Sequence, residues 1–212
     1  MQVSEIFHSI QGESTYAGLP CTFVRLTGCN LRCTWCDTEY AFYGGEKMSV
    51  DEVLGKVRAF PGKLIEITGG EPLLQKEVYP LMERLLAEGY RVMLETSGER
   101  PIAQVPREVV KIVDVKCPDS GEGGTFDLAN LEAMAPHDQV KFVIASRGDY
   151  EFARDFTHQH DLIRRFAAVL FSPVWGQMDL QQMAAWILAD ELDVRFGYQL
   201  HKLIWGAEAR GV

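Results

Sequence analysis

The sequence predicts an α/β fold in which about six parallel βα units form an incomplete TIM-type barrel. Three observations support this prediction. Short β-branched runs alternate with amphipathic helical segments along the chain. Polar residues and glycines follow nearly every predicted strand. The chain has 212 residues, whereas a closed eight-unit barrel needs roughly 250. We therefore expect a single domain, residues 1–212, with the carboxyl ends of its strands at one rim.

The predicted strands are short apolar runs bounded by turns or polar residues. In chain order they cover 3–10, 21–26, 64–68, 91–96, 109–115, 140–145, 167–171 and 194–200. The segments after these strands are rich in glycine, hydroxyl and charged residues. Because such residues end most strands anyway, this rim alone does not establish a site.

The predicted helices show apolar residues at helical spacing. Ser49 and Glu52 form a capping box before the first helix, and Gly89 ends the helix predicted at 76–88. Further helices are expected at 128–134, 150–166 and 180–192. The segment 120–125 contains three glycines, so its composition predicts a mobile loop.

Composition and charge exclude several classes of protein. The chain has 21 Lys and Arg against 30 Asp and Glu, a formal charge of −9. This balance argues against a broad surface for nucleic acid or anionic membranes. No apolar run approaches the ~20 residues of a membrane span, and the first residues lack the pattern of a signal peptide. We expect a cytoplasmic protein.

The five cysteines are Cys21, Cys29, Cys33, Cys36 and Cys117. Their odd number is a poor basis for disulfides. Cys29, Cys33 and Cys36 are close enough in sequence to converge on one soft metal centre, either zinc or an iron–sulfur cluster. A structural zinc site requires four protein ligands, and the sequence shows no evident fourth ligand. A four-iron cluster would keep one iron without a protein ligand. Dithiol chemistry at Cys33 and Cys36 is a third interpretation, but it leaves Cys29 unexplained.

Two motifs resemble those of the radical S-adenosylmethionine superfamily. One is Cys29-x-x-x-Cys33-x-x-Cys36, and the other is the Thr-Gly-Gly-Glu-Pro run at 68–72. The resemblance implies a [4Fe–4S] cluster on the loop 28–38. It also implies that S-adenosylmethionine binds the open iron and, after reduction, yields a radical that takes hydrogen from the substrate.

Other segments resemble the 7-carboxy-7-deazaguanine synthase family within that superfamily. They are Phe7 to Glu13, Arg25, Cys36-Asp37-Thr38 and Gln199-Leu200-His201-Lys202. The resemblance implies a lyase that converts 6-carboxy-5,6,7,8-tetrahydropterin to 7-carboxy-7-deazaguanine with release of ammonia, in queuosine and 7-deazapurine biosynthesis. It further implies Mg²⁺, a homodimer, and flavodoxin or ferredoxin as electron donor.

The same resemblance assigns residues to this site. Thr38 is the expected Mg²⁺ ligand. The expected substrate contacts are Ile10, Gln11, Gly12, Glu13, Arg25, Thr68 and His201. The expected S-adenosylmethionine contacts are Trp35, Cys36, Asp37, Gly70, Asp114, Val115, Lys116, Ser172, Pro173, Val174 and Trp175. The run 172–175 departs from the family's usual Gln-Pro, and no role is assigned to the tail 207–212.

Two other functions fit part of the pattern. A glycyl-radical activase would share the cluster loop but act on a protein, and a zinc-binding module would not be an enzyme. Taken singly, Gln11 to Glu13, Arg25, Thr38 and His201 are typical of a turn, an ion pair, a cap and a structural histidine. Their joint occurrence with the cysteine motif favours the radical enzyme.

Overall fold

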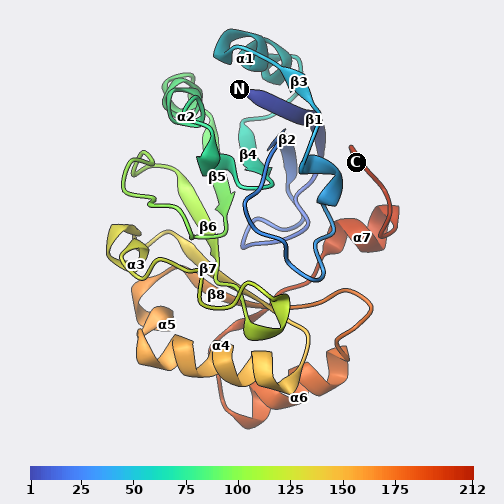
Figure 1. Ribbon diagram of the computed structural model, residues 1–212, viewed down its shortest axis with the longest axis vertical. Helices are drawn as coiled ribbons and strands as arrows, with labels where there is room; N and C mark the ends of the chain where they lie inside the picture. The colour runs from blue at the N-terminus through green and yellow to red at the C-terminus, as the bar shows by residue number, and fades with distance from the viewer.

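The computed structural model describes residues 1–212 and is built on one nine-stranded sheet (Figure 1). In spatial order the strands are β3 (Glu46–Lys47), β1 (Gln2–Ile10), β2 (Pro20–Leu26), β4 (Leu64–Gly69), β5 (Arg91–Thr96), β6 (Val110–Asp114), β7 (Gln139–Ile144), β8 (Ala168–Pro173) and β9 (Arg195–Phe196). Neighbours from β2 to β9 pair in parallel, and β1 pairs antiparallel with both β2 and β3. The sheet is open, with β3 and β9 at its edges.

The prediction of a partial barrel with about six parallel strands is confirmed by β2 and β4 to β8. The first strand differs, because only residues 11–19 connect β1 to β2. A parallel connection needs a crossover of a dozen or more residues, so these two strands pair antiparallel.

The helices are α1 (Val50–Arg58), α2 (Val78–Ala87), α3 (Asn130–Ala133), α4 (Arg147–Gln159), α5 (Leu162–Arg165), α6 (Leu180–Ala189) and α7 (Leu200–Trp205). Short 3₁₀ helices cover Glu39–Ala41, Pro72–Leu74 and Pro118–Ser120. The capping box is confirmed, since Ser49 accepts from the Glu52 amide and the Glu52 carboxylate accepts from the Ser49 amide. Gly89 has φ +76° after α2, which suits a helix stop.

Two of the predicted elements were wrong. The helix expected at 150–166 is split into α4 and α5, because Asp161 adopts a left-handed φ of 52° between them. The strand expected at 194–200 is only the two residues of β9, and Leu200 instead begins α7. The Leu200 amide donates to the Gly12 carbonyl at 2.9 Å, so docking on the N-terminal segment replaces pairing in the sheet.

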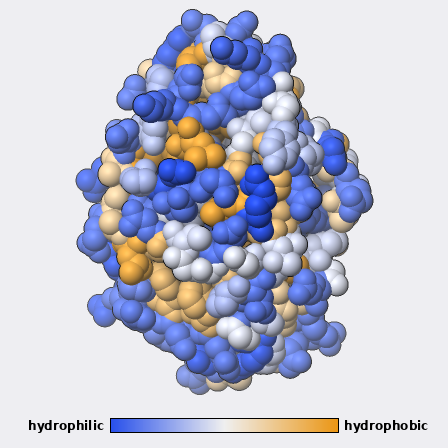
Figure 2. Space-filling model, viewed as in Figure 1, coloured by the Kyte–Doolittle hydropathy of each residue, from blue (hydrophilic) through white to orange (hydrophobic).

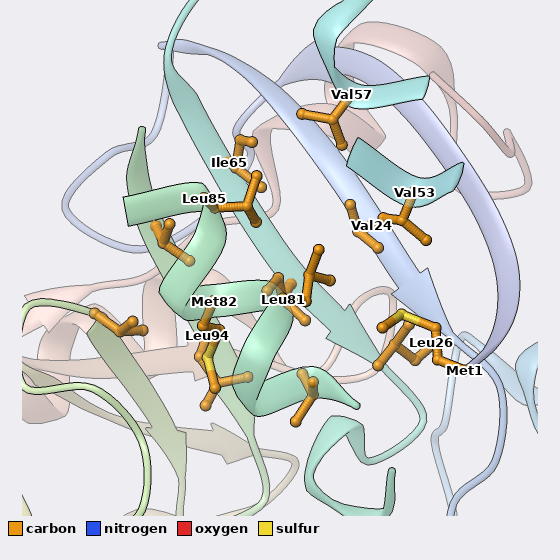
Figure 3. Close-up of a cluster of buried hydrophobic side chains, with 14 of the residues drawn as sticks. Met1, Val24, Leu26, Val53, Val57, Ile65, Leu81, Met82, Leu85 and Leu94 are labelled. Carbon is orange, nitrogen blue, oxygen red and sulfur yellow. The ribbon is translucent and has the colours of Figure 1, made fainter. Parts of the chain in front are cut away.

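Two hydrophobic cores cover the outer face of the sheet. The first packs α1 and α2 on β2, β4 and β5, with Leu81, Met82 and Leu85 against Ile65 and Leu94 (Figure 3). The second gathers residues of α4, α6, β7 and β8. The face in Figure 2 is mostly hydrophilic, with scattered hydrophobic groups. No helix has the length and apolar character needed to cross a bilayer.

Strand alternation directs other side chains to the inner face. On β4, Ile65 and Ile67 pack outward, so Glu66 and Thr68 point inward. A small apolar cluster on the inner face includes Phe23 and Met93. Polar side chains lie nearer the carboxyl ends of the strands, where they line a cavity.

Candidate active site

One cavity of about 540 Å³ lies at the carboxyl ends of the parallel strands. Its lining comes from the N-terminal segment, the cysteine loop, the strand ends, α7 and the tail. Every residue that the sequence assigned to the site lines this cavity, with the exception of Val115. Val115 is buried in the second core, because the inward position of Asp114 turns the next side chain outward.

The cysteine loop presents three free, partly buried thiols to the cavity. Burial raises the pKa of Cys29, Cys33 and Cys36, and the charge of Cys36 contributes to the raised pKa of Cys33. No three His, Cys, Asp or Glu side chains are gathered closely enough here to hold a single metal ion. Three thiols on one wall, with Cys21 and Cys117 buried elsewhere, are a donor set that fits a cluster with one open iron.

Hydrogen bonds and close packing hold the cysteine loop in place. The Thr34 amide and hydroxyl both donate to the Ser120 carbonyl, at 2.9 and 3.1 Å. The Arg32 amide donates to the Glu122 carboxylate at 2.5 Å. The glycine-rich segment 120–125, expected to be mobile, is therefore tied to the loop. A Cβ on Gly70 would overlap the Gly28 carbonyl and lie 2.9 Å from Cys29 Cβ, so this glycine lets the strand end meet the loop.

Glu71 fastens two strand ends to each other. Glu71 is only 1% exposed. Its carboxylate accepts four hydrogen bonds, from the amides of Leu73 and Ser97 and the hydroxyls of Thr96 and Ser97. These contacts lie at 2.8 to 3.0 Å. Because all its acceptor positions are used within the protein, Glu71 shapes the rim and leaves ligand binding to its neighbours.

The N-terminal segment and α7 meet across the cavity. A Cβ on Gly12 would overlap the His201 ring and lie 2.9 Å from the His201 amide nitrogen. Burial lowers the pKa of His201, although Glu13 opposes the shift, so the ring is neutral near pH 7. The Gln199 side chain donates to Glu13 at 2.9 Å. The predicted substrate contacts at 11–13 and 201 are therefore brought together.

A buried lysine that sequence reasoning missed organises the inner wall. Lys141 forms ion pairs with Glu13 at 3.0 Å, with Glu95, and with Asp114 at 3.8 Å. Burial alone would lower the pKa of Lys141, but these carboxylates raise it well above its usual value. Burial would likewise raise the pKa of Glu13, yet Lys141 lowers it. The sequence did contain a signal for Lys141, because it is a charged residue inside the otherwise strand-like run of β7.

Arg25 lines the cavity, and the Nε side of its guanidinium already forms an ion pair within the protein. Its Nε donates to Glu5 at 2.7 Å, and the Tyr40 hydroxyl donates to the same carboxylate oxygen at 2.7 Å. The guanidinium of Arg210 lies 4.2 Å from the centre of the Tyr40 ring. The tail, residues 207–212, thus folds back to line the cavity, which the sequence did not indicate.

Thr38 and Asp37 place oxygen atoms beside the cysteine loop. The Thr38 hydroxyl donates to Asp37 Oδ1 at 2.9 Å, and Lys202 donates to Asp37 Oδ2 at 2.6 Å. Burial alone would raise the pKa of Asp37, but the Lys202 ammonium lowers it. This carboxylate is therefore ionised at neutral pH, next to the expected Mg²⁺ ligand.

The residues expected to contact S-adenosylmethionine come from the cysteine loop and from the ends of β4, β6 and β8. Ser172, Pro173, Val174 and Trp175 line the cavity. Asp114 accepts from Lys116 at 2.8 Å through Oδ2, whereas its buried Oδ1 has no hydrogen-bond partner. A buried acceptor without a partner is the kind of atom that a ligand donor satisfies.

Comparisons with known proteins agree with this geometry. The radical SAM superfamily matches residues 23–155. A 7-carboxy-7-deazaguanine synthase of Koribacter versatilis is 58% identical, covering 100% of both chains. One from Chlorobaculum tepidum is 42% identical, covering 100% of this chain and 97% of the relative. The crystal structure of QueE from Escherichia coli superposes with a TM-score of 0.74 at 22% identity, covering 94% of each chain, which supports the fold. The chain belongs to the 7-carboxy-7-deazaguanine synthase family of the radical SAM superfamily.

Proposed function

We propose that this protein converts 6-carboxy-5,6,7,8-tetrahydropterin to 7-carboxy-7-deazaguanine with release of ammonia, on the route to queuosine and other 7-deazapurines. One observation carries this proposal. A single cavity joins the three free thiols to the substrate-contact residues that the family resemblance assigns. Full-length relatives bear the name of this synthase, which supports the same conclusion.

Cys29, Cys33 and Cys36 would hold the [4Fe–4S] cluster. When bound, the cluster and S-adenosylmethionine supply a 5′-deoxyadenosyl radical that abstracts hydrogen from the substrate. The chain's own contribution is to hold these groups against one wall. Trp35 and the residues at 172–175 line the cavity beside the loop, and Asp114 Oδ1 offers an acceptor without a partner.

Arg25 would bind the carboxylate of the substrate. Its Nε is held by Glu5 at 2.7 Å, which fixes the plane of the guanidinium. Nη1 donates one N–H to the Gly69 carbonyl at 3.4 Å, and the other Nη N–H groups remain for a second carboxylate. A forked pair needs this planar geometry. Lysine carries the charge but has no fork, so it cannot reproduce the contact.

Glu13 and its neighbours would bind the nitrogen-rich edge of the pterin. Lys141 keeps Glu13 ionised, so its carboxylate can accept from N–H groups of the ring. Thr68 donates its hydroxyl to Glu95 at 3.2 Å and faces the same space. His201, neutral and packed against Gly12, would cover the ring from α7. These contacts would hold the reacting carbon toward the radical.

Mg²⁺ would bind at Thr38, where the ionised Asp37 lies in contact with the ligand hydroxyl. Magnesium prefers oxygen ligands and commonly keeps substrate oxygens and waters in its shell. There it would neutralise the substrate carboxylate. The homodimer and the flavodoxin or ferredoxin donor stay predictions from the family resemblance.

The test is a product assay on protein reconstituted with iron and sulfide without oxygen. Incubation with the tetrahydropterin, S-adenosylmethionine, Mg²⁺ and a reductant should give 7-carboxy-7-deazaguanine, detected by mass spectrometry. Cys33→Ala should lose both cluster and product. Cys117→Ala is the matched control and should keep both, because Cys117 is buried in the second core.

Two results would contradict the proposal. If no deazaguanine forms while a partner protein gains a glycyl radical, the protein is an activase. If the purified protein is colourless, binds zinc, and unfolds on substitution of Cys29, it is a zinc-binding module.

A further inference from the structure

Glu66 is a carboxyl group in an apolar layer of the inner face. It lies on β4 in register with Phe23 of β2 and Met93 of β5, both members of the inner apolar cluster. Its residue is only 6% exposed, yet it lines the cavity. Glu66 is one pleat deeper than Thr68 on the same strand face, about 7 Å along the strand. It therefore forms part of the cavity floor, and neither cluster, cofactor nor substrate binding as proposed for this cavity uses it.

Gln11 is the hydrogen-bond partner of Glu66. Its Nε2 donates to Glu66 Oε2, while its Oε1 accepts from the Glu13 amide at 2.9 Å. These two contacts fix which way the Gln11 amide points. They use one of its two N–H groups and leave the second free. The other oxygen of Glu66, Oε1, makes no hydrogen bond within the protein.

The surroundings of Glu66 favour its neutral form. Burial, together with the nearby carboxylates of Glu95 on β5 and Glu13 after β1, raises its pKa to about 8. Lys141 on β7 and the bond from Gln11 oppose it. The thiol of Cys21 on β2, whose own pKa is raised by burial and by Glu66, also faces this carboxyl group. Because Oε2 accepts from Gln11, the proton of the neutral acid resides on Oε1.

We propose that Glu66 is a further substrate-binding and specificity-determining residue, whose Oε1–H and the free N–H of Gln11 form a pair of donors for a carbonyl oxygen of the substrate. This inference rests on the proposed function and extends it to the floor of the cavity. A carbonyl oxygen has two lone pairs, so it can accept from both donors. When Glu66 ionises, Oε1 becomes an acceptor and repels that oxygen.

Three variants test the proposal in the reconstituted holoenzyme. Glu66→Gln keeps an acceptor for Gln11 and an N–H donor for the cavity, but it cannot titrate. Glu66→Val removes both and leaves the Gln11 amide unsatisfied. Met93→Leu changes the same apolar layer without touching the donor pair, so it is the matched control.

The pH dependence of kcat/KM for the tetrahydropterin is the first measurement. For the wild type and Met93→Leu we expect kcat/KM to fall by about tenfold per pH unit above the Glu66 pKa, because only the protonated form binds. Glu66→Gln, which keeps an N–H donor, should retain more of the wild-type kcat/KM at pH 7 than Glu66→Val and should lack this fall. Glu66→Val should be about tenfold or more below the wild type at pH 7, mainly through KM. An identical fall in Glu66→Gln and the wild type would overturn the proposal.

Infrared difference spectroscopy of the protein between pH 6 and pH 10 is the second measurement, and it requires no turnover. The carbonyl band of a protonated carboxylic acid should disappear with a midpoint near 8 in the wild type and should be missing from Glu66→Gln. A band that persists in Glu66→Gln would also overturn the proposal. Lack of product from the wild type at every pH would instead contradict the proposed function.

Discussion

The contact between Gly12 and His201 gives a sharp test of how α7 completes the site. We predict that Gly12→Ala displaces α7 and impairs substrate binding while the barrel stays folded. The added Cβ would overlap the imidazole, with the His201 Cγ at 2.8 Å and its amide nitrogen at 2.9 Å. Carbon atoms pack best at about 3.5–4.0 Å, so α7 must move away from Gly12 by about 1 Å.

The size of the effect depends on how firmly α7 is held. Overpacking by one methyl group costs about 1–3 kcal/mol. The helix has six residues, and Leu203 and Trp205 on it are 61% and 49% exposed. Moving this helix is therefore easier than unfolding the barrel. If the whole overpacking free energy appears as displacement of α7, it corresponds to about a 5- to 150-fold loss in kcat/KM.

The assay compares kcat/KM and thermal stability in parallel. Gly55→Ala is the control for adding a methyl group, since its Cβ meets nothing within 4 Å on α1. It should leave kcat/KM unchanged and stabilise the protein by up to about 1 kcal/mol. Gly12→Ala should lower kcat/KM with little change in Tm.

A double variant separates the clash from other causes. If the His201 ring is what Gly12→Ala strikes, then His201→Ala combined with Gly12→Ala should lose little more than His201→Ala alone. A small residual effect is expected, because the amide nitrogen remains. Full additivity of the two losses, or wild-type kinetics for Gly12→Ala, would refute the reasoning.

Two further predictions concern the substrate carboxylate. Arg25→Lys should raise KM for the tetrahydropterin by about tenfold or more, because the charge remains but the fork is lost; unaltered steady-state kinetics would remove Arg25 from the carboxylate site. Thr38→Ala should weaken the stimulation of activity by Mg²⁺ while the iron content stays that of the wild type, as measured by metal titration and iron analysis; an unchanged Mg²⁺ response would show that the ion binds elsewhere.

Much of the site was predictable because its signals are local. The cysteine spacing, the Gly-Gly-Glu-Pro run and the capping box at Ser49 each act over a few residues, and the strand-end rule then gathers distant motifs at one rim. Strand alternation explains why the Val115 side chain does not line the cavity. A motif was carried over as a run of consecutive residues, whereas a strand turns every second side chain away from the cavity.

The contacts that were not predictable join segments far apart in the chain. Docking of α7 on Gly12 depends on the open side of the sheet, and the spacing of apolar residues in the sequence does not predict where that opening lies. The segment 194–200 has strand-like composition, yet its last residue begins α7, where the Leu200 amide donates to the Gly12 carbonyl. The return of the tail onto Tyr40 is of the same kind.

The charges of the inner wall show why pattern alone could not assign its roles. Four carboxyl groups, Glu13, Glu66, Glu95 and Asp114, share this space with the ammonium groups of Lys116 and Lys141. Separating so many like charges from water is costly unless each is paired. Lys141 contacts three of the carboxylates and Lys116 contacts Asp114, which leaves Glu66 as the group without a cation in contact. The most stable state of the wall therefore has Glu66 protonated, and the same feature that balances the charge turns the floor of the cavity into a hydrogen-bond donor.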